Sequence, residues 1–349
     1  MEKAGKKNEL SWLNLLFCAM VLYSHSSSQP ISALRHDSWQ FAVLYLLQRL
    51  IFVSVYGFFF ISGIKLTLPR AKKTPLGAYY KSRVKTILLP YLLANGVYYA
   101  WFCGVLRYFP PRLGDFLGYV VRGDLSAPFY FVVTLVQFTL LMPLLRRIAE
   151  RWSPALVLPF ALGVTWLSGM WLGSIAEFFT GRYFAYSDRI FTTYLFYYLA
   201  GCYVGQRYEA FVAAIKRSAG LIVGAFVLFG GADLYFTYAL RVQGRSVPFL
   251  ETVHYIYLPS GILLCFLIAL RLDRPLPKLL ARVDKASFLV YLYHSLFISA
   301  LDHLLARAGV VGELKPYLLR LAGVYILVPA LCILWQTLYS RVRIHAKNK

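Results

Sequence analysis

The sequence predicts an all-α membrane protein, a bundle of about ten transmembrane helices with both termini in the cytoplasm. Three observations predict it: 59% of the 349 residues are hydrophobic, apolar runs of about 20 residues recur along the chain, and Lys and Arg concentrate in alternating loops. A soluble domain of this length could not bury so much apolar surface. We therefore expect a single transmembrane domain over residues 1–349, without a separate soluble domain.

The predicted spans begin shortly after a basic N-terminal segment. They lie near residues 10–28, 42–66, 87–106, 128–145, 154–175, 190–206, 219–240, 252–270, 287–305 and 319–339. The start of the chain resembles a signal peptide, but no cleavage site of small residues follows it cleanly. We therefore interpret the first run as a retained span.

The residues that give the net charge of +22 are concentrated in alternating loops. Twenty-five of the 37 Lys and Arg residues fall in segments that are cytoplasmic if the N-terminus is inside, which indicates an even number of spans. The basic excess therefore predicts contact with lipid headgroups and not with nucleic acid. We expect a multi-pass protein of the plasma or inner membrane. Five cysteines lie in apolar runs without paired spacing, which favours buried thiols over disulfides or a metal site.

Two polar residues stand out in the first span, Asn14 and His25. His25 lies about 22 Å along this helix from Leu10, close to the outer surface. A histidine there can be an interfacial residue at a helix end. Alternatively, a neutral imidazole can act as a general base that takes a proton from a hydroxyl.

Further cations suggest either membrane anchoring or recognition of an anionic or polar substrate. Arg49 lies about 24 Å from Lys65 along the second span, nearly at the depth of His25. It is a membrane anchor or a substrate-binding residue. A basic segment just before the third span contains Lys81, Arg83 and Lys85. These cations either mark a cytoplasmic loop or bind the phosphates of a soluble donor.

Further polar residues lie in or near the later spans. Asp124 precedes the fourth span and is interpreted as a loop or capping residue; Tyr130 enters that span, and we expect Gln137 to form a hydrogen bond between helices. Asp233 and His294 lie within later spans, where polar residues usually face the bundle interior, so each predicts part of a cavity wall. No phosphate-binding glycine loop, serine elbow or zinc motif occurs, which argues against ATPases and metalloproteases.

Five segments in order resemble the acyltransferase 3 family of integral membrane O-acyltransferases. They are LSWLNLLFCAMVLYSH, VYGFFFISGIKL, YYKSRVKTILLPY, APFYFVVTLVQFTLLMP and KASFLVYLYHSLF. The last resembles the family's late segment, with Ser287, Tyr291 and His294 in matching places. Each segment is weak alone, but their order and spacing over nearly the whole chain make the resemblance specific.

The resemblance implies transfer of an acyl group, usually acetyl, from cytoplasmic acyl-CoA to an extracytoplasmic glycan or similar acceptor. His25 matches the family's essential histidine, and Arg83 matches the first arginine of its basic motif. The second basic position falls on Thr86, beside Lys85. Family members commonly carry arginine where this chain has Asn14, and we hypothesise that Arg49 supplies part of the missing charge.

The implied chemistry needs no metal and no permanently bound cofactor. The donor's phosphates are expected near Lys81, Arg83 and Lys85, and His25 deprotonates the acceptor hydroxyl or carries the acyl group itself. Asp124 and Tyr130 are expected to contact substrate, together with Asn14, Arg49 and His294. The alternatives are a transporter or flippase of glycan or lipid-linked intermediates, with Arg49, Asp233 and His294 along a pathway, and a non-catalytic scaffold.

Overall fold

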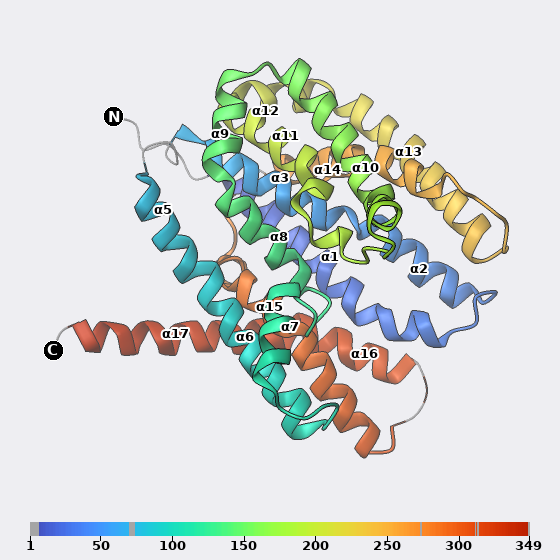
Figure 1. Cartoon of the computed structure of the whole chain (residues 1–349), viewed down its shortest axis with the longest axis vertical. Coiled ribbons are helices and arrows are strands. Elements are labelled where there is room, and N and C mark those ends of the chain that lie inside the picture. Colours follow the sequence, from blue (N-terminus) through green and yellow to red (C-terminus); the bar gives the residue numbers. More distant parts are fainter. Residues whose placement is uncertain (1–6, 70–73, 273, 311, 313, 348–349) are drawn as a thin grey trace. The chain divides into compact units, whose positions relative to one another are not determined.

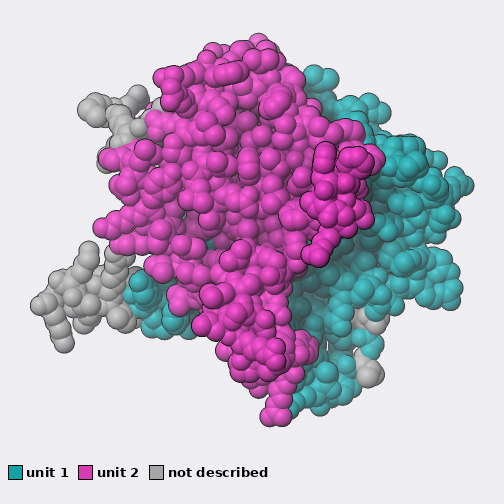
Figure 2. Space-filling model, viewed as in Figure 1, with its two compact units in different colours: residues 1–54, 218–349 teal, residues 55–217 magenta. Residues whose placement is uncertain are grey.

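The computed structural model describes residues 7–69, 74–272, 274–310, 312 and 314–347. In these ranges every regular element is a helix, so the predicted all-α class is confirmed for them (Figure 1). The chain forms two compact units: residues 1–54 with 218–349 (unit 1), and residues 55–217 (unit 2) (Figure 2).

Unit 1 combines helices from both ends of the chain. They are α1 (Asn8–Ala33), α2 (Trp39–Ile51), α13 (Ala219–Arg241), α14 (Leu250–Leu272), α15 (Lys278–Arg307), α16 (Leu314–Ala322), the π-helical turn η5 (Gly323–Leu327) and α17 (Val328–Lys347). Helix α1 contacts α2, α14, α15 and α16. The helix that carries Asn14 and His25 is therefore central to this unit.

Unit 2 begins within α3 (Val53–Thr67). Its other elements are α5 (Leu76–Arg83), η1 (Val84–Leu88), α6 (Leu89–Ala100), η2 (Trp101–Val105), α7 (Leu113–Arg122), α8 (Phe129–Leu140), α9 (Met142–Arg151), α10 (Pro154–Thr180), η3 (Ser187–Arg189), η4 (Phe191–Tyr194), α11 (Leu195–Gln206) and α12 (Tyr208–Arg217). Of these, η1 and η2 are π-helical and η3 and η4 are 3₁₀ turns.

Glycines bring α3 and α11 into backbone contact inside unit 2. A Cβ on Gly201 would lie 2.0 Å from the carbonyl oxygen of Phe60, and one on Gly63 would lie 2.1 Å from that of Tyr198. Gly205, one turn after Gly201, faces α3 in the same way. Small residues at this spacing allow close helix packing in membranes. The glycine of the FFFISG segment is therefore required by packing.

A π-helical turn accommodates the proline of the third predicted span. In η1 the N–H of Leu89 donates to the carbonyl oxygen of Val84, five residues earlier. Pro90 follows at the start of α6. Proline lacks an N–H and its ring clashes with the carbonyl four residues earlier, so a local π adjustment lets the helix continue through it.

Seven helices within the described residues are long and apolar enough to cross a membrane. The pair α8 and α9, bent by 62°, would make eight. These match eight of the ten predicted spans. Helix α1 is not among the seven, because Asn14, His25 and several serines lower its mean hydropathy, and α11 is too short at 12 residues. The number ten and the cytoplasmic termini stay predictions.

Some residues behind the predicted orientation lie outside the described ranges. They are Lys3, Lys6, Arg70, Lys72, Lys73 and Lys349.

Candidate functional site

Asn14 is held on the α15 helix by two hydrogen bonds. Its Nδ2 donates to Asp284 Oδ1 at 2.7 Å and to Ser287 Oγ at 2.9 Å. The two acceptors lie one turn apart on α15. The amide thus joins α1 to α15 near the start of both helices.

His25 lies three turns further along α1, on the same face as Asn14. Its ring contacts that of His294 on α15, with the ring centroids 5.0 Å apart. Asn14 precedes His25 on α1, and their partners Asp284 and His294 occur in the same order on α15. The two helices therefore run in the same direction. The predicted order requires this, since it makes them the first and ninth spans. Polar residues therefore face each other at two levels of one helix pair.

The backbone fixes the tautomer of His294. Its Nδ1 lies 2.7 Å from the carbonyl oxygen of Tyr291 and 3.2 Å from that of Val290. A carbonyl oxygen only accepts, so Nδ1 carries the hydrogen, and Nε2 of the neutral ring carries a lone pair. His294 is fully buried and its Nε2 has no hydrogen-bond partner among the described residues. An unused acceptor therefore lies in the ring that His25 contacts.

A buried ion pair that the sequence did not reveal lies beyond the histidines. Arg320 on α16 donates through Nε to Asp302 of α15 at 2.6 Å, and through Nη2 to Gln29 of α1. Gln29 is one turn beyond His25. Arg320 is 5% exposed. An arginine and an aspartate in neighbouring helices were the only sequence signal.

Arg49 belongs to a cluster of charged residues on α2, α13 and α14. Its guanidinium donates to Asp233 and Glu251, with shortest distances of 3.1 Å to each. His254 Nδ1 lies 2.9 Å from Asp233 Oδ2. The charge of Arg49 is thus balanced by two carboxylates. Its proposed contribution in place of an arginine at Asn14 stays a prediction, and Glu251 and His254 were not anticipated.

The basic segment of unit 2 is partly exposed. Lys81 and Lys85 are exposed, and the guanidinium of Arg83 lies 4.9 Å from the ring centre of Tyr79. The change from α5 to π-helical η1 at Val84 alters the angular spacing of the side chains that follow.

Asp124 accepts hydrogen bonds from two arginines of unit 2. Arg122 donates at 2.6 Å and Arg189 at 2.9 Å. Gln137 joins α8 to the η3–η4 segment, as expected of a residue that bonds helices: it donates to the carbonyl oxygen of Arg189 and accepts from the N–H of Phe191. Tyr130, in the first turn of α8, is partly buried.

Comparison with known families gives one match that covers nearly the whole chain. The model of the acyltransferase domain of the acyltransferase 3 family matches residues 7–336. The chain belongs to the acyltransferase 3 family. This confirms the resemblance at the level of the family, while the presence of asparagine at position 14 in a branch of it stays a prediction.

Two kinds of curated relative of this acyltransferase 3 protein carry different names. A protein of Bacillus subtilis named as a membrane-bound acyltransferase, YfiQ, is 25% identical over 72% of this chain and 69% of its own length. A Staphylococcus aureus protein named as a poly-beta-1,6-N-acetyl-D-glucosamine export protein is 24% identical over 93% of this chain and 90% of its own. One of the same name from Staphylococcus epidermidis is 25% identical over 85% and 83%. No solved structure matches the chain.

The acyltransferase 3 motifs divide between the two units. Asn14, His25, Arg49 and His294 belong to unit 1. Lys81, Arg83, Lys85, Asp124 and Tyr130 belong to unit 2. Within unit 1 the structure brings together the first-helix histidine and the late histidine, which the sequence had predicted only as separate polar residues.

Proposed function

We propose that this acyltransferase 3 protein is an O-acyltransferase of the plasma or inner membrane that moves an acyl group from cytoplasmic acyl-CoA to a hydroxyl of an extracytoplasmic glycan. The observation that best supports this is the contact between His25 and His294. It joins two separate family motifs at one point of the α1–α15 pair. In this proposal His25 is the general base.

The proposed reaction balances without a metal or redox partner. His25 accepts the proton of the acceptor hydroxyl, and the oxygen attacks the thioester carbonyl carbon. The carbon–sulfur bond then breaks, and the sulfur takes the proton from His25 to give free CoA and an ester. General base catalysis is typically worth a rate factor of about 10²–10⁴. If His25 itself forms an acyl-imidazole first, the kinetics are ping-pong.

The donor is proposed to bind through its phosphates at Lys81, Arg83 and Lys85. Two features support this. Lys81 and Lys85 are exposed, and no carboxylate within the described residues pairs with Lys81 or Lys85. The guanidinium of Arg83 lies over the ring of Tyr79, one turn earlier on α5, and this contact keeps the arginine beside the two lysines at the start of the third span.

The acceptor is proposed to be a hydroxyl-rich polymer of the cell envelope. Support comes from the relatives named for export of a β-1,6-linked N-acetylglucosamine polymer, since such a glycan has many hydroxyl groups. Asn14, Arg49, Asp124, Tyr130 and His294 stay candidates for substrate contacts.

Labelled acetyl-CoA supplied to inside-out vesicles tests the proposal. We expect label to enter an envelope polymer with the wild-type protein and not with His25→Ala. The matched control is His36→Ala, which changes an exposed histidine in the loop after α1. Absence of label with the wild-type protein, in vesicles that retain the acceptor, would contradict the enzyme.

Export of a glycan is the second candidate. The relatives' names favour it, and so does the charged cluster of Arg49, Asp233, Glu251 and His254, because ionisable residues within spans often mark transport pathways. Secretion and acylation of the glycan should be measured in the same His25→Ala cells. Loss of acylation with normal secretion supports the enzyme, and the reverse supports the exporter.

A further inference from the structure

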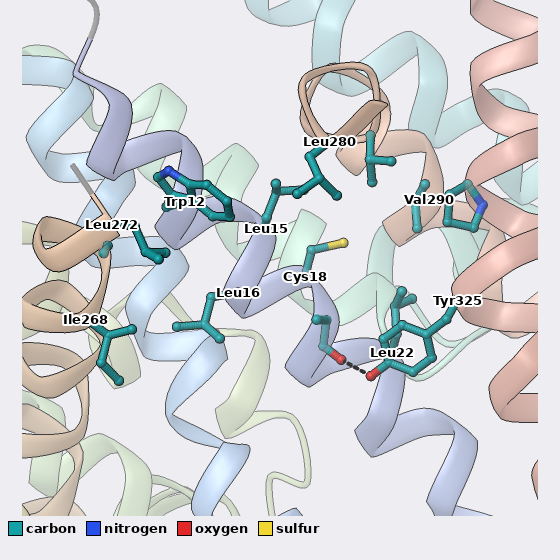
Figure 3. A pocket seen from close by; sticks show the side chains of 14 residues that line it. Trp12, Leu15, Leu16, Cys18, Leu22, Ile268, Leu272, Leu280, Val290 and Tyr325 are labelled. Atoms are coloured by element: carbon teal, nitrogen blue, oxygen red, sulfur yellow. Dashed lines mark hydrogen bonds between the residues drawn. The ribbon is translucent and has the colours of Figure 1, made fainter. Parts of the chain in front are cut away.

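Unit 1 contains an apolar, half-open cavity of about 400 Å³ along α1 (Figure 3). Side chains of α1, α14 and α15 line it, together with Tyr325 of η5 and Pro329 at the start of α17. On α1 the lining runs from Trp12 to Leu22, which is about 15 Å of helix. The cavity is therefore elongated along the helix that carries His25.

One end of this cavity adjoins the histidine pair. Val290 lines the cavity, and its carbonyl oxygen is an acceptor for His294 Nδ1. Leu22, on the opposite wall, precedes His25 by three residues, which is less than one turn. The lining thus comes within about one helical turn of both histidines, at Leu22 on α1 and at Val290 on α15.

The lining offers almost nothing to a polar ligand. Among the described residues that line it, none is charged. The indole N–H of Trp12 already donates to the carbonyl oxygen of Arg274, and the hydroxyl of Tyr325 donates to that of Ala19 (Figure 3). A polar ligand without hydrogen-bond partners is costly to bury, which argues against a sugar, a phosphate or the amides of a pantetheine arm. A hydrocarbon chain fits this chemistry.

We propose that this cavity binds the hydrocarbon chain of the acyl group that is transferred, so that the protein accepts acyl donors longer than acetyl. The inference rests on the proposed acyltransferase function. Size supports it, because an apolar cavity of about 150 Å³ is sufficient for benzene and this one is more than twice as large. Trp12, whose indole N–H donates to Arg274, is the lining residue of α1 that lies farthest from His25 along the helix.

A series of donors tests the inference with the purified full-length protein in lipid nanodiscs. Acetyl-, butyryl-, hexanoyl- and octanoyl-CoA are compared by kcat/KM on one glycan acceptor. We expect kcat/KM to rise by about fourfold for each added methylene that the cavity buries. If kcat/KM is highest for acetyl-CoA and falls with chain length, the inference is wrong, but the proposed acyltransferase function still holds. No transfer from any donor overturns the proposed function as well.

Two substitutions in the lining should move the preference in opposite directions. Ala19→Phe shortens the cavity and is expected to lower the octanoyl-to-acetyl ratio of kcat/KM by about tenfold or more. Leu16→Ala enlarges it and raises that ratio. The matched control is Val227→Phe, on an exposed part of α13, which leaves the ratio unchanged. Equal ratios in all four proteins overturn the inference.

Discussion

Asn14 Nδ2 donates a 2.7 Å hydrogen bond to Asp284, from the same helix that brings His25 against His294. Asn14 is thus not isolated in the membrane, and the same amide nitrogen also donates to Ser287. These two hydrogen bonds join α1 to α15 through a neutral side chain.

Two substitutions of Asn14 should separate the effect of side-chain size on stability from the effect of its hydrogen bond to Asp284. Asn14→Leu leaves Asp284 without this donor, so we expect the free energy of unfolding to fall by about 1–3 kcal/mol. Asn14→Arg should be tolerated, because its guanidinium can pair with Asp284. Thermal unfolding in detergent measures both. An Asn14→Arg protein less stable than Asn14→Leu would show that the site has no room for the longer side chain.

Loss of the base should reduce turnover more than binding. We expect His25→Ala to lower kcat by about 10²–10⁴-fold with little change in the melting temperature. His36→Ala serves as the control. If His25→Ala retains more than a tenth of the wild-type kcat, another residue is the base.

The Arg49 cluster allows its structural and functional roles to be separated. Arg49→Gln leaves Asp233 buried without its cation, so the loss of stability should be about 3–5 kcal/mol. The double variant Arg49→Gln with Asp233→Asn removes both charges and should recover most of that loss. Thermal unfolding and acyl transfer are measured together. Full activity in a stable double variant would disprove the hypothesis that Arg49 supplies charge to the reaction.

The glycine contact of unit 2 should not tolerate a side chain. Gly201→Val places a Cβ at 2.0 Å from the carbonyl oxygen of Phe60, so we expect a large loss of folded protein. Gly96→Ala is the matched control, since nothing lies within 4 Å of its added Cβ, and alanine favours a helix by about 1 kcal/mol. Fluorescence-detected gel filtration compares the two. Similar yields would mean that α3 and α11 can separate without cost.

The basic segment should affect donor binding more than turnover. Arg83→Gln and Lys85→Gln are expected to raise KM for acyl-CoA several-fold with a small change in kcat, and to weaken the dependence of KM on salt, because exposed charges are screened. Lys216→Gln, at an exposed position of α12, is the control. An unchanged KM in Arg83→Gln would rule out this residue as a phosphate ligand.

Most of the fold could be predicted because hydropathy is a local property. Eight of the ten predicted spans correspond to helices or a bent helix pair that can cross a membrane. The two exceptions have physical reasons. Helix α1 carries polar residues that contact α15. The 190–206 segment divides into one 3₁₀ turn, η4, and a short helix, α11, whose glycines pack against α3.

The candidate site was less accessible to sequence reasoning. Asn14, His25, Arg49 and His294 were identified because polar residues are rare in apolar runs. The contacts of His25 with His294, and of Arg49 with Asp233 and Glu251, join helices remote in the chain. No local pattern encodes such a pairing.

The sequence by itself determined that this protein is a helical membrane protein of the acyltransferase 3 family with a histidine near the end of its first helix. Composition and motif order suffice for this, because they act along the chain. Only the tertiary structure decided which polar residues meet, which tautomer His294 adopts and where an apolar cavity adjoins the histidines. These depend on the register and direction in which α1 packs against α15, and register follows from contacts between segments that the sequence keeps far apart.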